Sequence, residues 1–223
     1  MHIHIPFHWT LRTHAGSRPW LFNPVFRALN AGERLTARNT ELVIEGFPRS
    51  GNSFSVFAFL NAGAGNIAVA HHVHSPSQIV SAARYDIPAI LLIRSPKDAV
   101  TAGLAKIATH TASDLLRAYS VYYRALRPLR DHYVIAPFET VTTDFGRIVA
   151  AVNRRFGTGF EEFDQNRHRM LRKAFLAQEK LEASAYAPLT ERHPRFERYA
   201  FLVERAERHH AAYMTLAQDD RTA

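Results

Sequence analysis

The chain has 223 residues, a formal net charge of +8 and no cysteine. This length suits one domain, or at most two, with a full hydrophobic core, and the absence of cysteine excludes disulfides, cysteine-ligated metals and cysteine nucleophiles. No apolar run reaches the ~20 residues of a membrane-spanning helix, and the N-terminal histidines argue against a secretory signal, so we expect a soluble, cytoplasmic protein. The surplus of positive charge indicates a nucleic acid, an anionic membrane surface or an anionic small molecule as partner.

The chain divides into three regions that we expect to form one domain. Residues 1–40 are basic and aromatic, and we expect an irregular N-terminal extension because helix-breaking residues recur there. These residues are Gly16, Pro19, Pro24 and Gly32. Residues 41–160 carry the alternating strands and helices of a core, and residues 161–223 form a helical C-terminal part.

Four apolar segments predict strands, at 41–46, 66–72, 88–94 and 132–138. Helices are expected at 52–63, 75–84, 95–110, 112–130 and 144–156, and from about 165 onward with breaks near Pro188 and Pro194. The apolar runs are continuous rather than alternating, which is typical of strands that are buried on both faces. We therefore expect a three-layer α/β fold with a central parallel sheet.

The loop at 46–53 lies between the first strand and a helix, which is the arrangement of a phosphate-binding loop. It reads GFPRSGNS and matches the pattern G-x-x-x-x-G-K-[ST], except that Asn52 replaces the lysine. The missing lysine argues against hydrolysis of ATP or GTP, but Arg49 keeps a positive charge for anion binding. The alternative interpretation is a tight turn with an exposed arginine.

A second arginine, Arg94, ends the strand at 88–94. Ligands of open α/β sheets bind at the carboxyl ends of the strands, so Arg94 and the loop at 46–53 belong to the same edge. Two arginine-bearing strand ends fit a ligand with two separated phosphate groups.

These segments resemble the PAPS-dependent sulfotransferases, which use 3′-phosphoadenosine 5′-phosphosulfate. FPRSGNSF (47–54) resembles the family's 5′-phosphosulfate loop, and ILLIRSPKDAVTAG (90–103) resembles its 3′-phosphate motif. HVHSP (72–76) is similar to the segment that carries the family's catalytic histidine, and IAPFE (135–139) to its Tyr-Glu stretch. The resemblance covers about 41–160, and it implies a P-loop NTPase-like fold around about five parallel strands, with this region as the nucleotide-binding core.

The resemblance assigns the 5′-phosphosulfate to five residues of the loop: Arg49, Ser50, Gly51, Asn52 and Ser53. Arg49 would also act in catalysis, because it would stabilise the charge that grows on the leaving phosphate. Phe54 takes the place of an aromatic residue that the family stacks on adenine. The alternative for Phe54 is a core residue of the helix.

Arg94 would hold the 3′-phosphate, since a planar guanidinium suits phosphate oxygens. The family's serine, eight residues later, is Ala102 here, so either Thr101 or a basic group of the C-terminal part would complete that site. The available groups are Arg167, Arg169, Arg172, Lys173 and Arg192. Phe138 and Glu139 replace the Tyr-Glu pair, with a buried aromatic and a capping acid as the alternative interpretation.

His74 would be the general base, because its spacing to Pro76 matches the family's histidine and imidazole titrates near neutral pH. His72 takes the place of a lysine of the family, and whether His72 or His74 is the base stays open. A metal site formed by His71, His72 and His74 is disfavoured because no carboxylate stands nearby in the sequence.

The implied activity is transfer of a sulfuryl group from PAPS to a hydroxyl or amine, without a metal and with adenosine 3′,5′-bisphosphate (PAP) as product. The acceptor is unidentified and belongs to the small molecules, glycans or lipids. A homodimer is one way to complete its pocket, and residues 1–40 either pack as an extension or lie on an anionic membrane. The alternatives are a P-loop-type small-molecule kinase, or other nucleotide-binding protein, with an altered lysine and, last, a nucleic-acid binder, for which no sequence signature is present.

Overall fold

The computed structural model describes residues 9–30, 34–63, 65–106, 110–183 and 194–222. Its sheet has the strand order β2-β1-β3-β4, and all neighbouring strands are parallel. The strands are β1 (Leu42–Gly46), β2 (Val69–His71), β3 (Ala89–Ile93) and β4 (Val134–Pro137). The expected parallel α/β architecture is confirmed, whereas the described residues contain four strands and not the fifth that the family resemblance implies.

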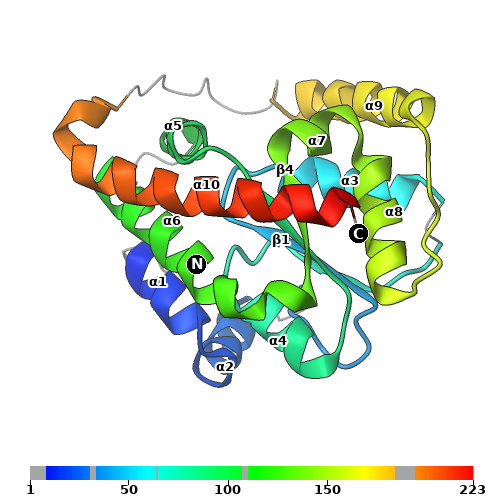
Figure 1. The fold of residues 1–223 in the computed structure, drawn as a ribbon, viewed down its shortest axis with the longest axis horizontal. Helices are drawn as coiled ribbons and strands as arrows, with labels where there is room; N and C mark the ends of the chain where they lie inside the picture. The colour runs from blue at the N-terminus through cyan, green and yellow to red at the C-terminus, as the bar shows by residue number, and fades with distance from the viewer. Residues whose placement is uncertain (1–8, 31–33, 64, 107–109, 184–193, 223) are drawn as a thin grey trace.

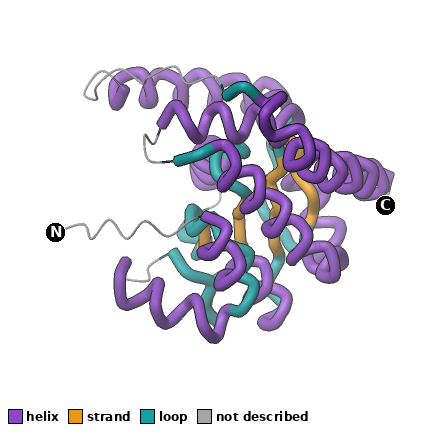
Figure 2. The backbone as a smooth tube through the Cα atoms, turned by 90° about the vertical axis from the view of Figure 1, so that its left-hand side faces the viewer, coloured by secondary structure: helices purple, strands orange, loops and turns teal. Residues whose placement is uncertain are grey.

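Helices cover both faces of the sheet, as Figure 2 shows. Ile44, Ile90 and Val134 share one face, where they pack with α3 (Asn52–Asn61), α7 (Phe138–Thr143), α8 (Phe145–Phe156) and α9 (Gln165–Ala183). Val43, Leu91 and Ile135 share the other face with α4 (Ser77–Tyr85), α5 (Pro96–Lys106), α6 (Ala112–Leu126) and α10 (Ala200–Thr222), which crosses the front of the molecule in Figure 1. Burial on both faces explains the continuous apolar runs.

Most of the expected helices form, with shifts at their ends. The Asp144 side chain accepts the N–H of Arg147 and caps α8, and Gly157 ends this helix at a φ of 65°. The segment expected as one helix over 112–130 is α6 followed by a 3-10 helix, η1 (Arg127–His132). Helix α7 was not expected, and β2 begins three residues later than the predicted 66–72 and ends before His72, which turns the chain with a φ of 58°.

The expectation of an irregular segment at 1–40 is wrong for its described part, which forms α1 (Trp9–Gly16) and α2 (Pro19–Asn30). The supposed breakers fall mainly at helix ends. Gly16 is the last residue of α1, and Pro19 begins α2, where a missing N–H costs nothing. Pro24 lies inside α2 and is exposed.

Helix α1 is attached to α6, which lies far away in the sequence. The backbone N–H of Trp9 donates to Asp114 Oδ2 at 2.6 Å, across 105 positions of the chain. The Thr10 hydroxyl donates to the other carboxylate oxygen at 2.6 Å, and Trp9 Nε1 donates to His110 Nε2 at 2.7 Å. Asp114 thus supplies the N-terminal carboxylate that α1 lacks in its own sequence.

The C-terminal part is helical, as expected. Pro194 lies two residues before a second 3-10 helix, η2 (Phe196–Tyr199), whereas Pro188 and Arg192 lie outside the described residues. No helix in the described ranges is both long and apolar enough to cross a membrane.

Candidate functional site

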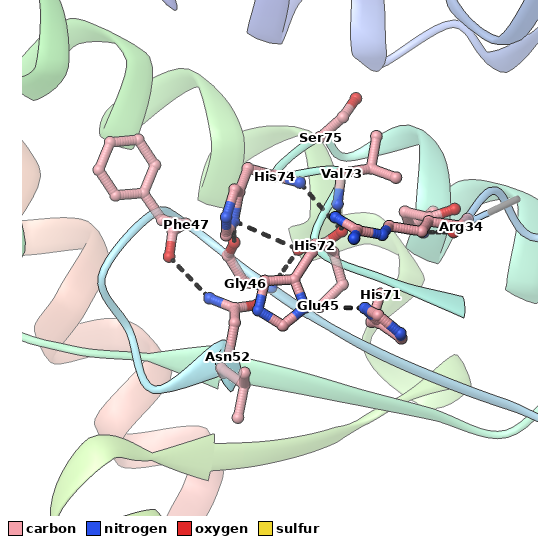
Figure 3. Close-up of polar contacts among 12 residues, drawn as sticks. Arg34, Glu45, Gly46, Phe47, Asn52, His71, His72, Val73, His74 and Ser75 are labelled. Atoms are coloured by element: carbon pink, nitrogen blue, oxygen red, sulfur yellow. Dashed lines mark hydrogen bonds and ion pairs between the residues drawn. The ribbon is translucent and has the colours of Figure 1, made fainter. Parts of the chain in front are cut away.

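The loop after β1 is shaped by two glycines and by Asn52. A Cβ on Gly46 would lie 2.7 Å from both the Cβ and the carbonyl oxygen of Leu92, so a side chain does not fit there. Gly51 has a φ of 97°, in the left-handed region that favours glycine. The Asn52 amide is buried and donates to the Phe47 carbonyl at 3.3 Å (Figure 3). The residue in the lysine position therefore supports the loop with its side chain.

The same loop presents donors and charge at the start of α3. The first N–H groups of a helix have no acceptor within the helix, and the helix dipole places positive charge there. The Arg49 side chain is exposed beside this helix end, and its backbone has a φ of 67°. Ser50 is buried and Ser53 is exposed. Together these groups form a cradle of the kind that binds phosphate.

Arg94 connects the end of β3 to this loop. Its Nη1 donates to the carbonyl oxygen of Arg49 at 3.1 Å, across 45 positions of the sequence. Its guanidinium lies 4.1 Å from the centre of the half-buried Phe138 ring. The buried Nε of Arg94 has no acceptor within the described part of the chain. Arg94 therefore carries a donor that an anion at this position would satisfy.

Other residues that were expected to bind the nucleotide make no hydrogen bond to Arg49 or Arg94 among the described residues. Phe54 is buried, and its ring packs edge-on against His168 and Phe175, which supports the core alternative. Thr101 is half-buried in α5, and no hydrogen bond joins it to Arg94 among the described residues. The remaining basic candidates with a described position lie on α9: Arg167, Arg169, Arg172 and Lys173. Of these, Arg167 donates to the carbonyl of Asn61 at the end of α3.

The histidine turn, residues 71–74, follows β2 and is held by the buried carboxyl group of Glu45. One oxygen, Oε2, accepts the N–H groups of Val73 at 2.9 Å and His74 at 3.0 Å. The other oxygen, Oε1, accepts the N–H of Gly46 at 2.9 Å (Figure 3). These bonds fix a backbone in which His74 has a φ of 52°. Burial raises the pKa of Glu45 to about 8, while the N–H donors and Arg12 act in the opposite direction.

Arg12 holds the same turn from helix α1. Its Nη2 donates to the carbonyl of Val73 at 2.6 Å, and its guanidinium lies 4.9 Å from the centre of the Trp9 ring. Burial lowers the pKa of Arg12, and the nearby Glu45 acts in the opposite direction. Glu45 and Arg12 were not predicted as site residues, although an acid inside the apolar segment 41–46 was a visible signal.

One ring nitrogen of His74 is hydrogen-bonded, and the other has no hydrogen-bond partner among the described residues. Its Nδ1 lies 3.1 Å from the carbonyl oxygen of Gly46, and because a carbonyl only accepts, Nδ1 carries the proton. The lone pair is then on Nε2, which makes no hydrogen bond to any described residue. Burial lowers the pKa of His74 to about 4, and Arg12, Arg49 and Lys106 act in the same direction. The ring is therefore neutral near pH 7 and able to accept a proton at Nε2.

His72 is engaged at both ring nitrogens. Its Nδ1 lies 2.7 Å from Nδ1 of His71, and its Nε2 lies 3.1 Å from the hydroxyl of Ser53. Burial lowers the pKa of His72 to about 3, with further contributions from His71 and His74. This geometry favours His74 over His72 as a base. No group of three or more His, Asp or Glu side chains in the described ranges is arranged to hold a metal.

Three of the four motifs predicted from the sequence thus meet at the carboxyl edge of the sheet. His74 bonds Gly46, Ser53 contacts His72, and Arg94 bonds Arg49. A scan of known protein families and searches of curated proteins and of solved structures each found no match to this chain.

Proposed function

We propose that the chain is a PAPS-dependent sulfotransferase with a P-loop-like fold and His74 as its general base. The observation that supports this proposal is the set of hydrogen bonds joining the phosphate loop to the histidine turn and to Arg94. The three segments come from three different strand ends, and each carries one component that sulfuryl transfer requires. These components are an anion cradle, a second phosphate ligand and a neutral base.

Two groups would hold the nucleotide. Arg49 and the N–H groups at the start of α3 would bind the 5′-phosphosulfate, and Arg94 would bind the 3′-phosphate, where its buried Nε finds an acceptor. PAPS supplies the activated sulfuryl group. Arg49 stabilises the phosphate charge that develops as the bond between sulfur and the phosphate oxygen breaks.

His74 would remove the proton of the acceptor. The acceptor oxygen or nitrogen forms the new bond to sulfur, its proton moves to Nε2 of His74, and PAP leaves with the electrons of the broken bond. The bond from Nδ1 to Gly46 keeps the ring in the required tautomer and orientation. The side chain of Asn52, which replaces the lysine of nucleotide triphosphatases, is already used inside the loop, so a phosphoryl-transfer role has no support from this position.

Thermal unfolding with a panel of nucleotides tests the proposal. PAP should raise Tm more than AMP, which lacks the 3′-phosphate, and more than ATP with magnesium. A larger shift with ATP and magnesium would favour the kinase alternative. No shift with any nucleotide would contradict a nucleotide site of either kind.

Two variants assign the phosphates. Arg94→Gln should reduce the PAP shift to that of AMP and leave the AMP shift unchanged, because only the 3′-phosphate ligand is lost. Arg49→Asn should reduce both shifts, and asparagine tolerates the left-handed backbone at this position. Arg84→Ala, an exposed arginine on α4, is the control and should change neither. Equal effects of Arg94→Gln on PAP and AMP would contradict the assignment.

A further inference from the structure

Helix α2 has an outward half made only of apolar residues. The members of this face, called the α2 apolar face below, are Trp20, Leu21, Pro24, Val25, Ala28 and Leu29, and all are exposed. At 100° per residue they span one half of the helix circumference. The exposed fractions are 72% for Trp20, 57% for Val25 and 60% for Leu29. An uninterrupted apolar half-helix in contact with water indicates a surface that another molecule covers.

The opposite half of α2 is packed onto the functional site. Phe22 is buried in one cluster with Leu35 and Val73, and the Phe26 ring stacks on Phe22 at 5.4 Å. Val73 is the residue between His72 and His74. The orientation of α2 is therefore fixed by the core, so the apolar face cannot be hidden by rotating the helix.

The described charged side chains that flank α2 in the sequence are all arginines. Arg18 precedes α2, Arg27 lies on its last turn, and both side chains are exposed. Arg34 and Arg38, which follow in the chain, are exposed as well. Among residues 1–40 the sequence contains one acidic residue, Glu33, against five arginines. A partner that covers the face is thus expected to be apolar at its centre and negatively charged around it.

We infer that the α2 apolar face inserts into the surface of an anionic lipid bilayer. A helix with an apolar half, a tryptophan and flanking arginines is typical of helices that lie in the membrane interface. Anionic headgroups would neutralise the arginines. A second copy of the chain fits less well, since a symmetric dimer through this face would bring its arginines together. Docking would hold the histidine turn about one helix diameter, ~10 Å, from the bilayer.

Flotation of the full chain with vesicles tests this inference. The chain should float with vesicles of equal parts phosphatidylglycerol and phosphatidylcholine, and much less with phosphatidylcholine alone. The double variant Leu21→Glu, Val25→Glu should lower the partition coefficient by about 100-fold, because two apolar side chains no longer insert. Phe201→Glu is the matched control, since Phe201 is 68% exposed on α10, and it should float like the unchanged chain.

Two further measurements separate the outcomes. Tryptophan emission should shift to the blue when the anionic vesicles are added, and Trp20→Phe should remove that shift while Trp9 is retained. Light scattering in solution should show the same mass for the unchanged chain and for the double variant. Equal flotation of the unchanged chain and the double variant would overturn the inference. A dimer of the unchanged chain that is absent in the double variant would also overturn it, because the α2 apolar face would then bind a second copy of the chain. These outcomes do not depend on nucleotide binding or transfer.

Discussion

The imidazole of His74 is neutral near pH 7, and its Nε2 makes no hydrogen bond to the described residues. Its Nδ1 is occupied by the Gly46 carbonyl, and its pKa is lowered to about 4, mainly by burial. A base of this kind stays unprotonated throughout the mildly acidic range. The neighbouring His72 shares the low pKa but has no free nitrogen.

Replacing His74 should greatly reduce sulfuryl transfer and leave PAP binding unchanged. His74→Asn keeps a residue that tolerates the left-handed backbone, so the PAP-induced rise of Tm should be unchanged. Transfer from radiolabelled PAPS to a panel of phenols, sugars and lipid alcohols should fall by at least about 100-fold. In the unchanged chain the acid limb of kcat/KM should lie near pH 4 rather than near 6.5, as follows from the lowered pKa. His72→Asn with a larger loss of transfer than His74→Asn would reassign the base.

Single residues show what the sequence could and could not predict. Arg49, Arg94 and His74 could be proposed from the sequence because their neighbours form recognisable motifs. Glu45 and Arg12 were missed because their partners lie elsewhere in the chain: Glu45 binds N–H groups 28 and 29 positions away, and Arg12 a carbonyl 61 positions away. Asn52 was predicted as a phosphate ligand from its place in the loop, but the hydrogen bond of its amide to the Phe47 carbonyl depends on the folded turn and could not be predicted.

The elements of the core were predictable and those of the N-terminus were not. Continuous apolar runs identify β1, β3 and β4, and the helix predicted at 144–156 agrees with α8 to within one residue. Helices α1 and α2 were misread because Gly16 and Pro19 stand at helix ends, where propensity carries little information, and because α2 continues through Pro24. Both helices make tertiary contacts: Asp114 binds the start of α1, and Phe22 of α2 packs with Leu35 and Val73.

The turn between β2 and α4 depends on one acid. Glu45→Ala should lower the free energy of unfolding by about 3 kcal/mol, since it leaves two buried N–H groups and one partly buried N–H group without an acceptor and Arg12 without its neighbouring acid. Urea denaturation measures this change. Glu41→Ala is the control, because Glu41 also accepts a backbone N–H, from Ala68 at 2.8 Å, but is exposed, and the cost should stay below about 1 kcal/mol. Equal costs would show that Glu45 does not hold the turn.

For the whole molecule, the half-buried His74 makes stability depend on pH. His74 binds a proton near pH 6.5 when unfolded but only near pH 4 when folded. Between these values the unfolded state holds more protons, so acidification lowers the free energy of unfolding. Glu45 has the opposite sign, because its raised pKa gives stability that is lost as the pH rises through about 8. A variant is therefore needed to distinguish the contribution of His74 to the free energy of unfolding from that of Glu45.

His74→Asn isolates the histidine contribution. The stability of the unchanged chain relative to this variant should fall by about 3 kcal/mol between pH 6.5 and pH 4, since each pKa unit corresponds to about 1.4 kcal/mol. Urea denaturation at several pH values gives this difference directly. Parallel curves for the two proteins would show that His74 titrates equally in the folded and unfolded states.

The bond between Trp9 and Asp114 has a consequence for the order of events on the ribosome. The 105 positions that separate the two residues take about 5 to 20 s to synthesise at 5–20 residues per second. During that interval the nascent N-terminal helices lack the partner that orients them. The apolar half of α2 is then available to a chaperone or a membrane before the parallel sheet exists, so the membrane contact inferred above would precede folding rather than follow it.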